Sequence, residues 1–159
     1  MNVRVIAVGR LKERFYEDAQ KEFVKRLSRY CAIEVIEVQD EPAREKLSSA
    51  ERERVLDIEG ARILSRVRED ETLVALCIDG EMRSSEQFAS EIAALALAGK
   101  SKISFAIGGS LGLSEGVRRR ANIRLSFSPM TFSHQIFRAM LLEQIYRAFK
   151  INAGEPYHK

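Results

Sequence analysis

The sequence Ile103-Ser-Phe-Ala-Ile-Gly-Gly-Ser-Leu-Gly112 joins an apolar, strand-like run to a loop rich in glycine. A second apolar run behaves in the same way, because it ends at Phe127 and passes through small and polar residues to His134. Ligands of open α/β sheets bind at the carboxyl ends of strands, where loops expose backbone groups. We therefore expect the loops after these two runs to form the floor and rim of a ligand pocket.

The rest of the chain alternates between strand-like and helix-like patterns. Met1–Val8 is almost continuously apolar, which is typical of a strand covered on both faces in a parallel sheet. We expect further strands at Ile33–Val38, Thr72–Ile78, Lys102–Ile107 and Ile123–Phe127, and helices at Arg14–Tyr30, Ala43–Val67, Ser84–Ala98, Ser114–Ala121 and Ser133–Ile151. The dipeptide Asp79-Gly80 predicts a turn that ends the third strand, and Ser84 and Gln87 have the spacing of a capping box that opens the next helix. This order predicts an α/β fold with a mostly parallel sheet and flanking helices.

Length and composition predict one soluble domain that spans residues 1–159. The chain is 45% hydrophobic and 31% charged, which is typical of a folded protein with a core and not of a disordered chain. No apolar run approaches the roughly 20 residues of a membrane span. Cys31 and Cys77 have no companions at zinc spacing and the chain lacks a signal-like start, so we expect reduced thiols in a cytoplasmic protein.

The distribution of charge favours an anionic partner. The net charge is only +3, but residues 111–159 carry eight Lys or Arg against three acids. A basic region beside the expected pocket indicates a partner such as nucleic acid. An ordinary solvated surface would carry similar charges, so charge alone leaves both interpretations open.

Familiar signatures of phosphate, metal and acyl-transfer chemistry are missing. The loop Gly108–Gly112 lacks the Lys-Ser or Lys-Thr of a phosphate loop and does not fit G-x-G-x-x-G. No His or acidic cluster has metal-ligand spacing, and Ser110 and Ser114 lack the flanks of a nucleophile elbow. The sequence therefore disfavours a P-loop NTPase, a metal site and a hydrolase. The glycine pair either admits a ligand close to the backbone or forms a tight turn.

The last expected helix has two apolar stripes. One is formed by Phe137, Leu141 and Ile145, and the other by Ala139, Leu142 and Tyr146. A helix buried on two faces needs two packing partners, and in a chain of this length we expect one of them to be a second subunit. The pattern therefore predicts a homodimer.

Several polar side chains near the carboxyl terminus are candidates for function. His134 lies at the start of the last helix, where the positive end of the helix dipole would keep it neutral. Arg147 follows Glu143 by four residues, a spacing that also suits a surface ion pair. Tyr157 and His158 add a ring that can stack on a base and a titratable donor, which suits RNA.

Four segments together make the chain recognisable. They are Ile107-Gly-Gly-Ser-Leu-Gly-Leu113, Leu125-Ser-Phe-Ser-Pro-Met-Thr-Phe-Ser-His-Gln135, Leu142-Glu-Gln-Ile-Tyr-Arg-Ala-Phe149 and Gly154-Glu-Pro-Tyr-His158. These segments closely resemble the RlmH (YbeA) family of the SPOUT superfamily, whose members methylate N3 of a pseudouridine in the large ribosomal subunit. The resemblance extends over the full chain in length and in the order of its elements.

The resemblance implies a C-terminal trefoil knot, a homodimer and S-adenosylmethionine held by the knot loops. The implied substrate is a pseudouridine in the helix 69 loop of 23S rRNA within the assembled 70S ribosome. Positions that match cofactor contacts of the family are Leu76, Gly108, Phe127, Ser128, Pro129, Met130, Thr131 and Phe132. Arg147, Tyr157 and His158 match its functional tail, which would bind RNA or steer a proton, and His134 is a further catalytic candidate. Ser110, Pro129 and Ser133 depart from the usual family pattern, so the conformation of their loops stays open.

Two other classes of protein share some of these features. A non-catalytic, dimeric RNA-binding module would need the basic C-terminal region but no cofactor loops. A flavodoxin-like nucleotide or flavin binder would use the same type of sheet and would carry a bound flavin or phosphate ligand. Binding of S-adenosylmethionine separates the methyltransferase from both.

Overall fold

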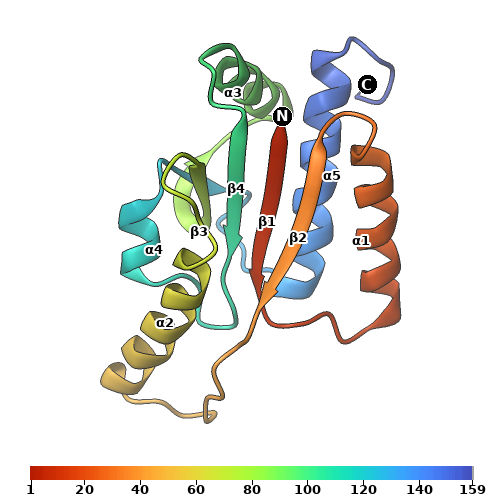
Figure 1. Cartoon of the computed structure of the whole chain (residues 1–159). Coiled ribbons are helices and arrows are strands. Elements are labelled where there is room, and N and C mark those ends of the chain that lie inside the picture. Colours follow the sequence, from red (N-terminus) through yellow and green to blue (C-terminus); the bar gives the residue numbers. More distant parts are fainter. Residues whose placement is uncertain (159) are drawn as a thin grey trace.

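The computed structural model describes residues 1–158, which fold around one parallel sheet (Figure 1). Within these residues the strands are β1 (Asn2–Val8), β2 (Ala32–Val38), β3 (Thr72–Met82), β4 (Lys102–Ile107) and β5 (Ile123–Ser126). The helices are α1 (Arg14–Leu27), α2 (Ser49–Leu64), α3 (Ser85–Leu97), α4 (Glu115–Arg120) and α5 (His134–Asn152). The strand order is β2-β1-β4-β3-β5, and all neighbouring strands pair in parallel. The predicted α/β fold with a parallel sheet is confirmed.

Helices cover both faces of the sheet, and the central strand β1 shows why. Successive side chains of a strand point to opposite faces. Val3 and Val5 therefore join an apolar cluster with α1, α3 and α5, whereas Ile6 and Val8 join another cluster with α2 and α4. All four side chains are at most 1% exposed, as the continuous apolar run of this strand predicts.

Helix α2 begins later than predicted. The periodicity predicts a helix from Ala43, but the helix begins at Ser49 because Ser48 caps it. The Ser48 hydroxyl accepts a hydrogen bond from the backbone N–H of Glu51 at 3.2 Å, and the Glu51 carboxylate accepts one from the Ser48 N–H at 2.7 Å. This capping box has the same spacing as the one predicted at Ser84 and Gln87, which the structure confirms.

Strand β3 does not end in a turn at Asp79-Gly80, so that prediction was wrong. The strand continues to Met82 and pairs with β5, with a shift of register between Leu76 and Glu81. Pairing with a neighbouring strand outweighs the local preference for a turn. Gly80 permits this approach, because a Cβ there would lie only 2.7 Å from the carbonyl carbon of Leu125.

Both apolar stripes of α5 find partners inside the chain. Leu141, Leu142 and Ile145 are fully buried, and Tyr146 contacts the ring of Phe23 on α1 and that of Tyr30 just after it. Helices α1 and α3 flank α5 on the same face of the sheet. The two packing partners that α5 needs are therefore found within one chain. The stripes of α5 no longer require a second subunit, and the homodimer stays a prediction.

Neither cysteine forms a disulfide, as expected. Burial raises the pKa of Cys31 to about 11, which makes it an inert core thiol at neutral pH. No helix within residues 1–158 combines the length and apolar character that crossing a membrane requires.

Candidate functional site

A pocket of about 650 Å³ lies where residues 76–79 of β3 meet the loops after β4 and β5. We call it the loop pocket. Its walls come from Leu76–Asp79, from Ile107–Leu113 and from residues between Leu125 and Phe137. Strands that run in parallel deliver their following loops to one edge of the sheet, which explains why segments so distant in sequence meet here.

The glycine loop after β4 is a tight turn that also forms a wall of the loop pocket. Gly109 and Gly112 form an isolated bridge, in which the Gly112 N–H donates to the Gly109 carbonyl at 3.1 Å. A Cβ on Gly108 would overlap the backbone of Gly112, and Gly112 has a φ of 88°, which favours glycine. The structure therefore confirms the tight turn, and close approach of a ligand to this backbone stays a prediction.

The loop after β5 is held by its own serines. The Ser126 hydroxyl donates to the Ser128 carbonyl at 3.2 Å, and the Ser128 hydroxyl accepts from the Met130 N–H at 3.0 Å. Most positions predicted to contact a cofactor line the loop pocket, namely Leu76, Gly108, Phe127, Ser128, Met130, Thr131 and Phe132. Pro129 is exposed and does not line the pocket.

His134 lines the same pocket at the start of α5. Burial lowers the pKa of His134, and the positive charges of Arg138 and Lys12 lower it further. A lowered pKa favours the neutral imidazole at physiological pH, and its causes here are burial and neighbouring cations. It packs against Gly9, where a Cβ would lie 3.8 Å from its Nε2 atom.

Arg138 anchors this end of α5 to the sheet. Its side chain is fully buried, and its guanidinium donates to the Glu37 carboxylate at 2.6 Å and to the Gly9 carbonyl at 3.1 Å. Arg138 follows His134 by one helical turn, so these bonds hold the first turns of α5, which carry His134. Sequence reasoning missed this role, because Arg138 resembles the other arginines of the basic C-terminal region.

Glu59 of α2 supports the glycine loop from the opposite face of the sheet. Its Oε1 atom accepts from the Glu41 N–H at 3.0 Å, whereas Oε2 has no hydrogen-bond partner within residues 1–158. A Cβ on Gly109 would lie 3.2 Å from Oε2, so the loop rests directly on this carboxyl group. Burial raises the pKa of Glu59. No pattern in the charged helix distinguishes it from its exposed neighbours.

Arg147, Tyr157 and His158 lie together, but away from the predicted cofactor positions. The Arg147 guanidinium lies 4.7 Å from the centre of the Tyr157 ring, and its Nη1 atom lies 3.2 Å from Nδ1 of His158. The Tyr157 hydroxyl donates to Glu143 at 3.1 Å, and Nε2 of His158 lies 2.7 Å from Glu86 on α3. Arg147 also pairs with Glu143, the ion pair that its spacing allows. The tail thus folds back onto α5 and α3.

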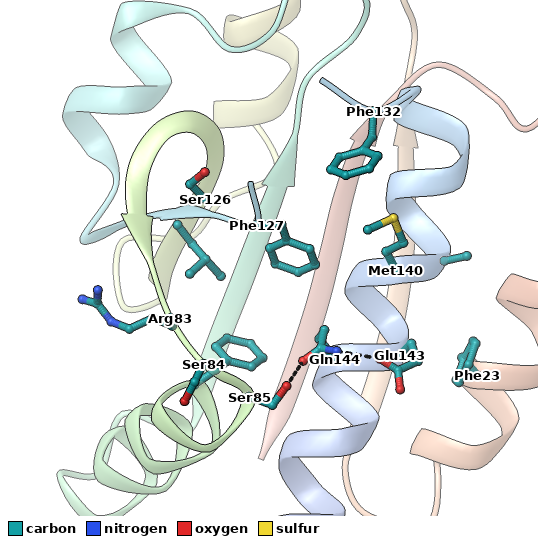
Figure 2. Close-up of a pocket in the computed structure, with 13 residues that line it drawn as sticks. Phe23, Arg83, Ser84, Ser85, Ser126, Phe127, Phe132, Met140, Glu143 and Gln144 are labelled. Atoms are coloured by element: carbon teal, nitrogen blue, oxygen red, sulfur yellow. Dashed lines mark hydrogen bonds between the residues drawn. The ribbon is translucent and has the colours of Figure 1, made fainter. Parts of the chain in front are cut away.

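A second pocket, of about 510 Å³, lies between the end of β5, α3 and α5 (Figure 2). We call it the helix pocket, because α3 and α5 each form one of its walls. It shares Leu125, Ser126, Phe127 and Phe132 with the loop pocket, and its far wall includes Glu143, which binds the tail. Sequence reasoning missed it, since its residues come from elements that only the tertiary fold brings together.

Within the described part of the chain, no group of His, Cys, Asp or Glu side chains could hold a metal ion.

Comparison with known proteins decides the family. The family model described as "Predicted SPOUT methyltransferase" matches residues 1–158. The chain belongs to the SPOUT methyltransferases. Among this family it is 52% identical to a Listeria monocytogenes protein and 55% identical to a Bacillus cytotoxicus protein, and each alignment covers all of both chains. Both relatives are named Ribosomal RNA large subunit methyltransferase H, in agreement with the resemblance found in the sequence.

Solved structures share the fold of this SPOUT methyltransferase. A methylase family protein from Neisseria gonorrhoeae has a TM-score of 0.53 at 16% identity, with 99% of this chain and 86% of that chain covered. The tRNA (m1G37) methyltransferase from Aquifex aeolicus has a TM-score of 0.52 at 13% identity, with 92% and 70% covered. At these identities the likeness concerns the fold alone.

Proposed function

We propose that the protein transfers a methyl group from S-adenosylmethionine to N3 of a pseudouridine in the helix 69 loop of 23S rRNA. The observation that carries this proposal is the identity of more than half of all residues, over the full length, to ribosomal RNA large subunit methyltransferases. The assembled 70S ribosome in the cytoplasm is the proposed substrate. The non-catalytic RNA-binding module is the alternative.

The loop pocket fits S-adenosylmethionine by its size and by its walls. Its volume is within the range of about 300–1,000 Å³ that is usual for small-molecule sites. Gly108 lines the pocket in a turn that only glycine permits, because the Gly112 backbone fills the place of a Cβ, and Phe127 and Phe132 offer apolar contact. The residues that would hold the cofactor are Leu76, Gly108, Phe127, Ser128, Met130, Thr131 and Phe132, with Pro129 at the outer side of the loop.

When bound, S-adenosylmethionine supplies a methyl group that N3 attacks while the electron pair of the breaking C–S bond stays on sulfur, which leaves a thioether. The protein then has to align the acceptor, exclude water and remove the N3 proton. We propose His134 as the acceptor of that proton, because it is neutral and lines the loop pocket. Arg147, Tyr157 and His158 are proposed to bind the RNA, which requires them to exchange their contacts with Glu143 and Glu86 for contacts with RNA.

We also propose that the chain forms a homodimer and that its C-terminal part is knotted. The homodimer is supported by three exposed apolar side chains, Met130, Phe132 and Ile136, which are close in sequence at the start of α5. Such side chains are usual at subunit interfaces. Light scattering that gives the mass of one chain at micromolar concentration would contradict the homodimer.

Titration calorimetry with S-adenosylmethionine tests the cofactor site. We expect one molecule to bind per chain, and we expect Gly108→Ala to abolish binding, because the added methyl group would overlap the Gly112 backbone. Gly116→Ala is the control, since its backbone has no positive φ and a Cβ there would meet its nearest atom at 3.7 Å. An unaltered protein that binds no S-adenosylmethionine would favour the non-catalytic alternative.

A further inference from the structure

Glu59 of α2 is a buried carboxyl group with one unsatisfied oxygen. The residue is only 5% exposed, and its Oε2 atom has no hydrogen-bond partner within residues 1–158. The neighbouring cation, Arg62, is paired with Glu41 at 2.8 Å and also donates to the Gln39 carbonyl at 3.0 Å. Burial of a carboxyl group without a full set of partners costs stability, so stability alone does not account for this residue.

A single glycine separates this carboxyl group from the loop pocket. Gly109 lines the pocket, and a Cβ on Gly109 would lie 3.2 Å from Oε2 and 3.4 Å from Oε1 of Glu59. Both oxygens therefore lie against the rear of the glycine loop, where no side chain thickens the wall. Because Glu59 is buried, water and salt screen its charge only weakly, and its field extends through this thin wall into the pocket.

The lining of the loop pocket brings no net charge of its own. Its charged side chains are Asp79 and Arg118, which form an ion pair with a distance of 2.9 Å between Oδ1 and Nη1. His134 also lines the pocket, and its lowered pKa favours the neutral form. The lining therefore does not offset the negative charge of an ionised Glu59. Such a pocket favours a cationic ligand over a neutral ligand of the same shape.

We propose that the ionised carboxylate of Glu59 makes the loop pocket selective for the positively charged methyl donor over the neutral thioether that remains after transfer; this inference rests on the proposed methyl transfer. S-adenosylmethionine carries its positive charge on sulfur, and loss of the methyl group removes that charge. Glu59 thus strengthens binding before the reaction and no longer does so afterwards, which favours release of the spent form, S-adenosylhomocysteine. It acts through its charge across Gly109 and not by contact with the cofactor.

Calorimetry with both forms of the cofactor tests this role, because they differ by one methyl group and one charge. At pH 8 we expect Glu59→Gln to raise the Kd for S-adenosylmethionine about 10-fold and the Kd for S-adenosylhomocysteine less than about 2-fold. Glutamine keeps the shape of the side chain and removes its charge. Glu53→Gln is the matched control. It removes the same charge from an exposed position on the same helix and should change neither Kd.

The pH dependence of the unaltered protein provides a second test. Burial raises the pKa of Glu59, the negative charges of Asp40 and Glu41 act in the same direction, and the hydrogen bond from the Glu41 N–H and the charge of Arg62 oppose them. Glu59 therefore takes up its proton at a higher pH than an exposed glutamate, and the selectivity is full above its folded pKa and lost below it. As pH falls from about 8 to about 5, the ratio of the two Kd values should approach that of Glu59→Gln.

Each outcome bears on one claim. Equal losses of affinity for the two forms in Glu59→Gln would show that Glu59 only supports the shape of the glycine loop, and would overturn the proposal. A ratio of Kd values that stays constant with pH in the unaltered protein would overturn it as well. If the variant fails to fold, the pH series decides alone. An unaltered protein that binds neither form would overturn the proposed methyl transfer, and this inference with it.

Discussion

Two buried charged side chains, Glu59 and Arg138, fix the surroundings of the loop pocket from opposite faces of the sheet. Glu59 lies under the glycine loop, and Arg138 ties the start of α5 to Gly9 and Glu37. Neither could be predicted, because burial of a charged residue depends on partners that are remote in sequence. The position of His134 at the pocket could be predicted. The start of its helix is visible in the sequence, and the preceding strand ends at the edge of the sheet where ligands bind in such folds.

Glu59→Gln tests the carboxyl group under the glycine loop. Because burial raises its pKa in the folded state, Glu59 favours folding most at pH values below its unfolded pKa, and this stabilisation is lost as pH rises through the folded pKa. A neutral glutamine avoids that loss. We expect Glu59→Gln to melt about 2–4 °C above wild type at pH 8, a change of roughly 1 kcal/mol, and the difference to shrink at pH 5. A variant that is less stable at pH 8 would contradict this account.

His134→Gln tests the proposed proton acceptor. With the pKa of His134 lowered by burial, the wild-type rate of methyl transfer should stay high through neutral pH and fall only below the ordinary pKa of histidine. We expect the variant to lose about 100-fold or more in kcat and to lose the acidic limb of the pH profile. Calorimetry with S-adenosylmethionine provides the control. A variant with a wild-type pH profile would exclude His134 as the base.

At the scale of elements, local sequence predicted most helices and strands, and tertiary pairing decided the exceptions. The capping box at Ser84 was recognised, whereas the equivalent box at Ser48 was hidden by a helical pattern that extends back to Ala43. Strand β3 runs through Asp79-Gly80 because β5 lies beside it, and a neighbour that follows about 40 residues later is invisible to a local rule.

The contact between α2 and α4 provides a prediction at this scale. Gly60 of α2 packs on Ser114, the residue that caps α4 after the glycine loop, and a Cβ on Gly60 would lie 2.8 Å from the Cβ of Ser114. Gly60→Ala should therefore separate the helices and lower the melting temperature, as overpacking typically costs about 1–3 kcal/mol. Gly116→Ala is the matched control, because the nearest atom to its Cβ would be 3.7 Å away. Equal melting temperatures for the two variants would contradict this packing.

At the scale of the whole molecule, the sequence could not show how its conspicuous residues are grouped. The positions matched to cofactor contacts gather around the loop pocket, but Arg147, Tyr157 and His158 lie together away from it. Strand order and the docking of the tail produce this separation, and both depend on contacts between distant segments. The resemblance identified the family, and only the fold revealed the helix pocket.

Deletion of residues 156–159 tests the role of the tail. In the described part of the chain, Tyr157 and His158 contact Glu143, Arg147 and Glu86, none of which lines the loop pocket. The truncated protein should therefore bind S-adenosylmethionine with unchanged Kd, while methyl transfer to ribosomes should fall at least about 100-fold. Unchanged turnover would remove the tail from the mechanism.

The most direct measurement of the central claim is transfer of tritiated methyl groups from S-adenosylmethionine to 70S ribosomes from cells that lack the enzyme. The labelled nucleotide is then mapped in the 23S rRNA. We predict that label appears at one pseudouridine in the helix 69 loop, on N3, and that ribosomes from cells with the enzyme accept none. Label on another nucleotide, or no label from a protein that binds S-adenosylmethionine, would contradict the proposed function.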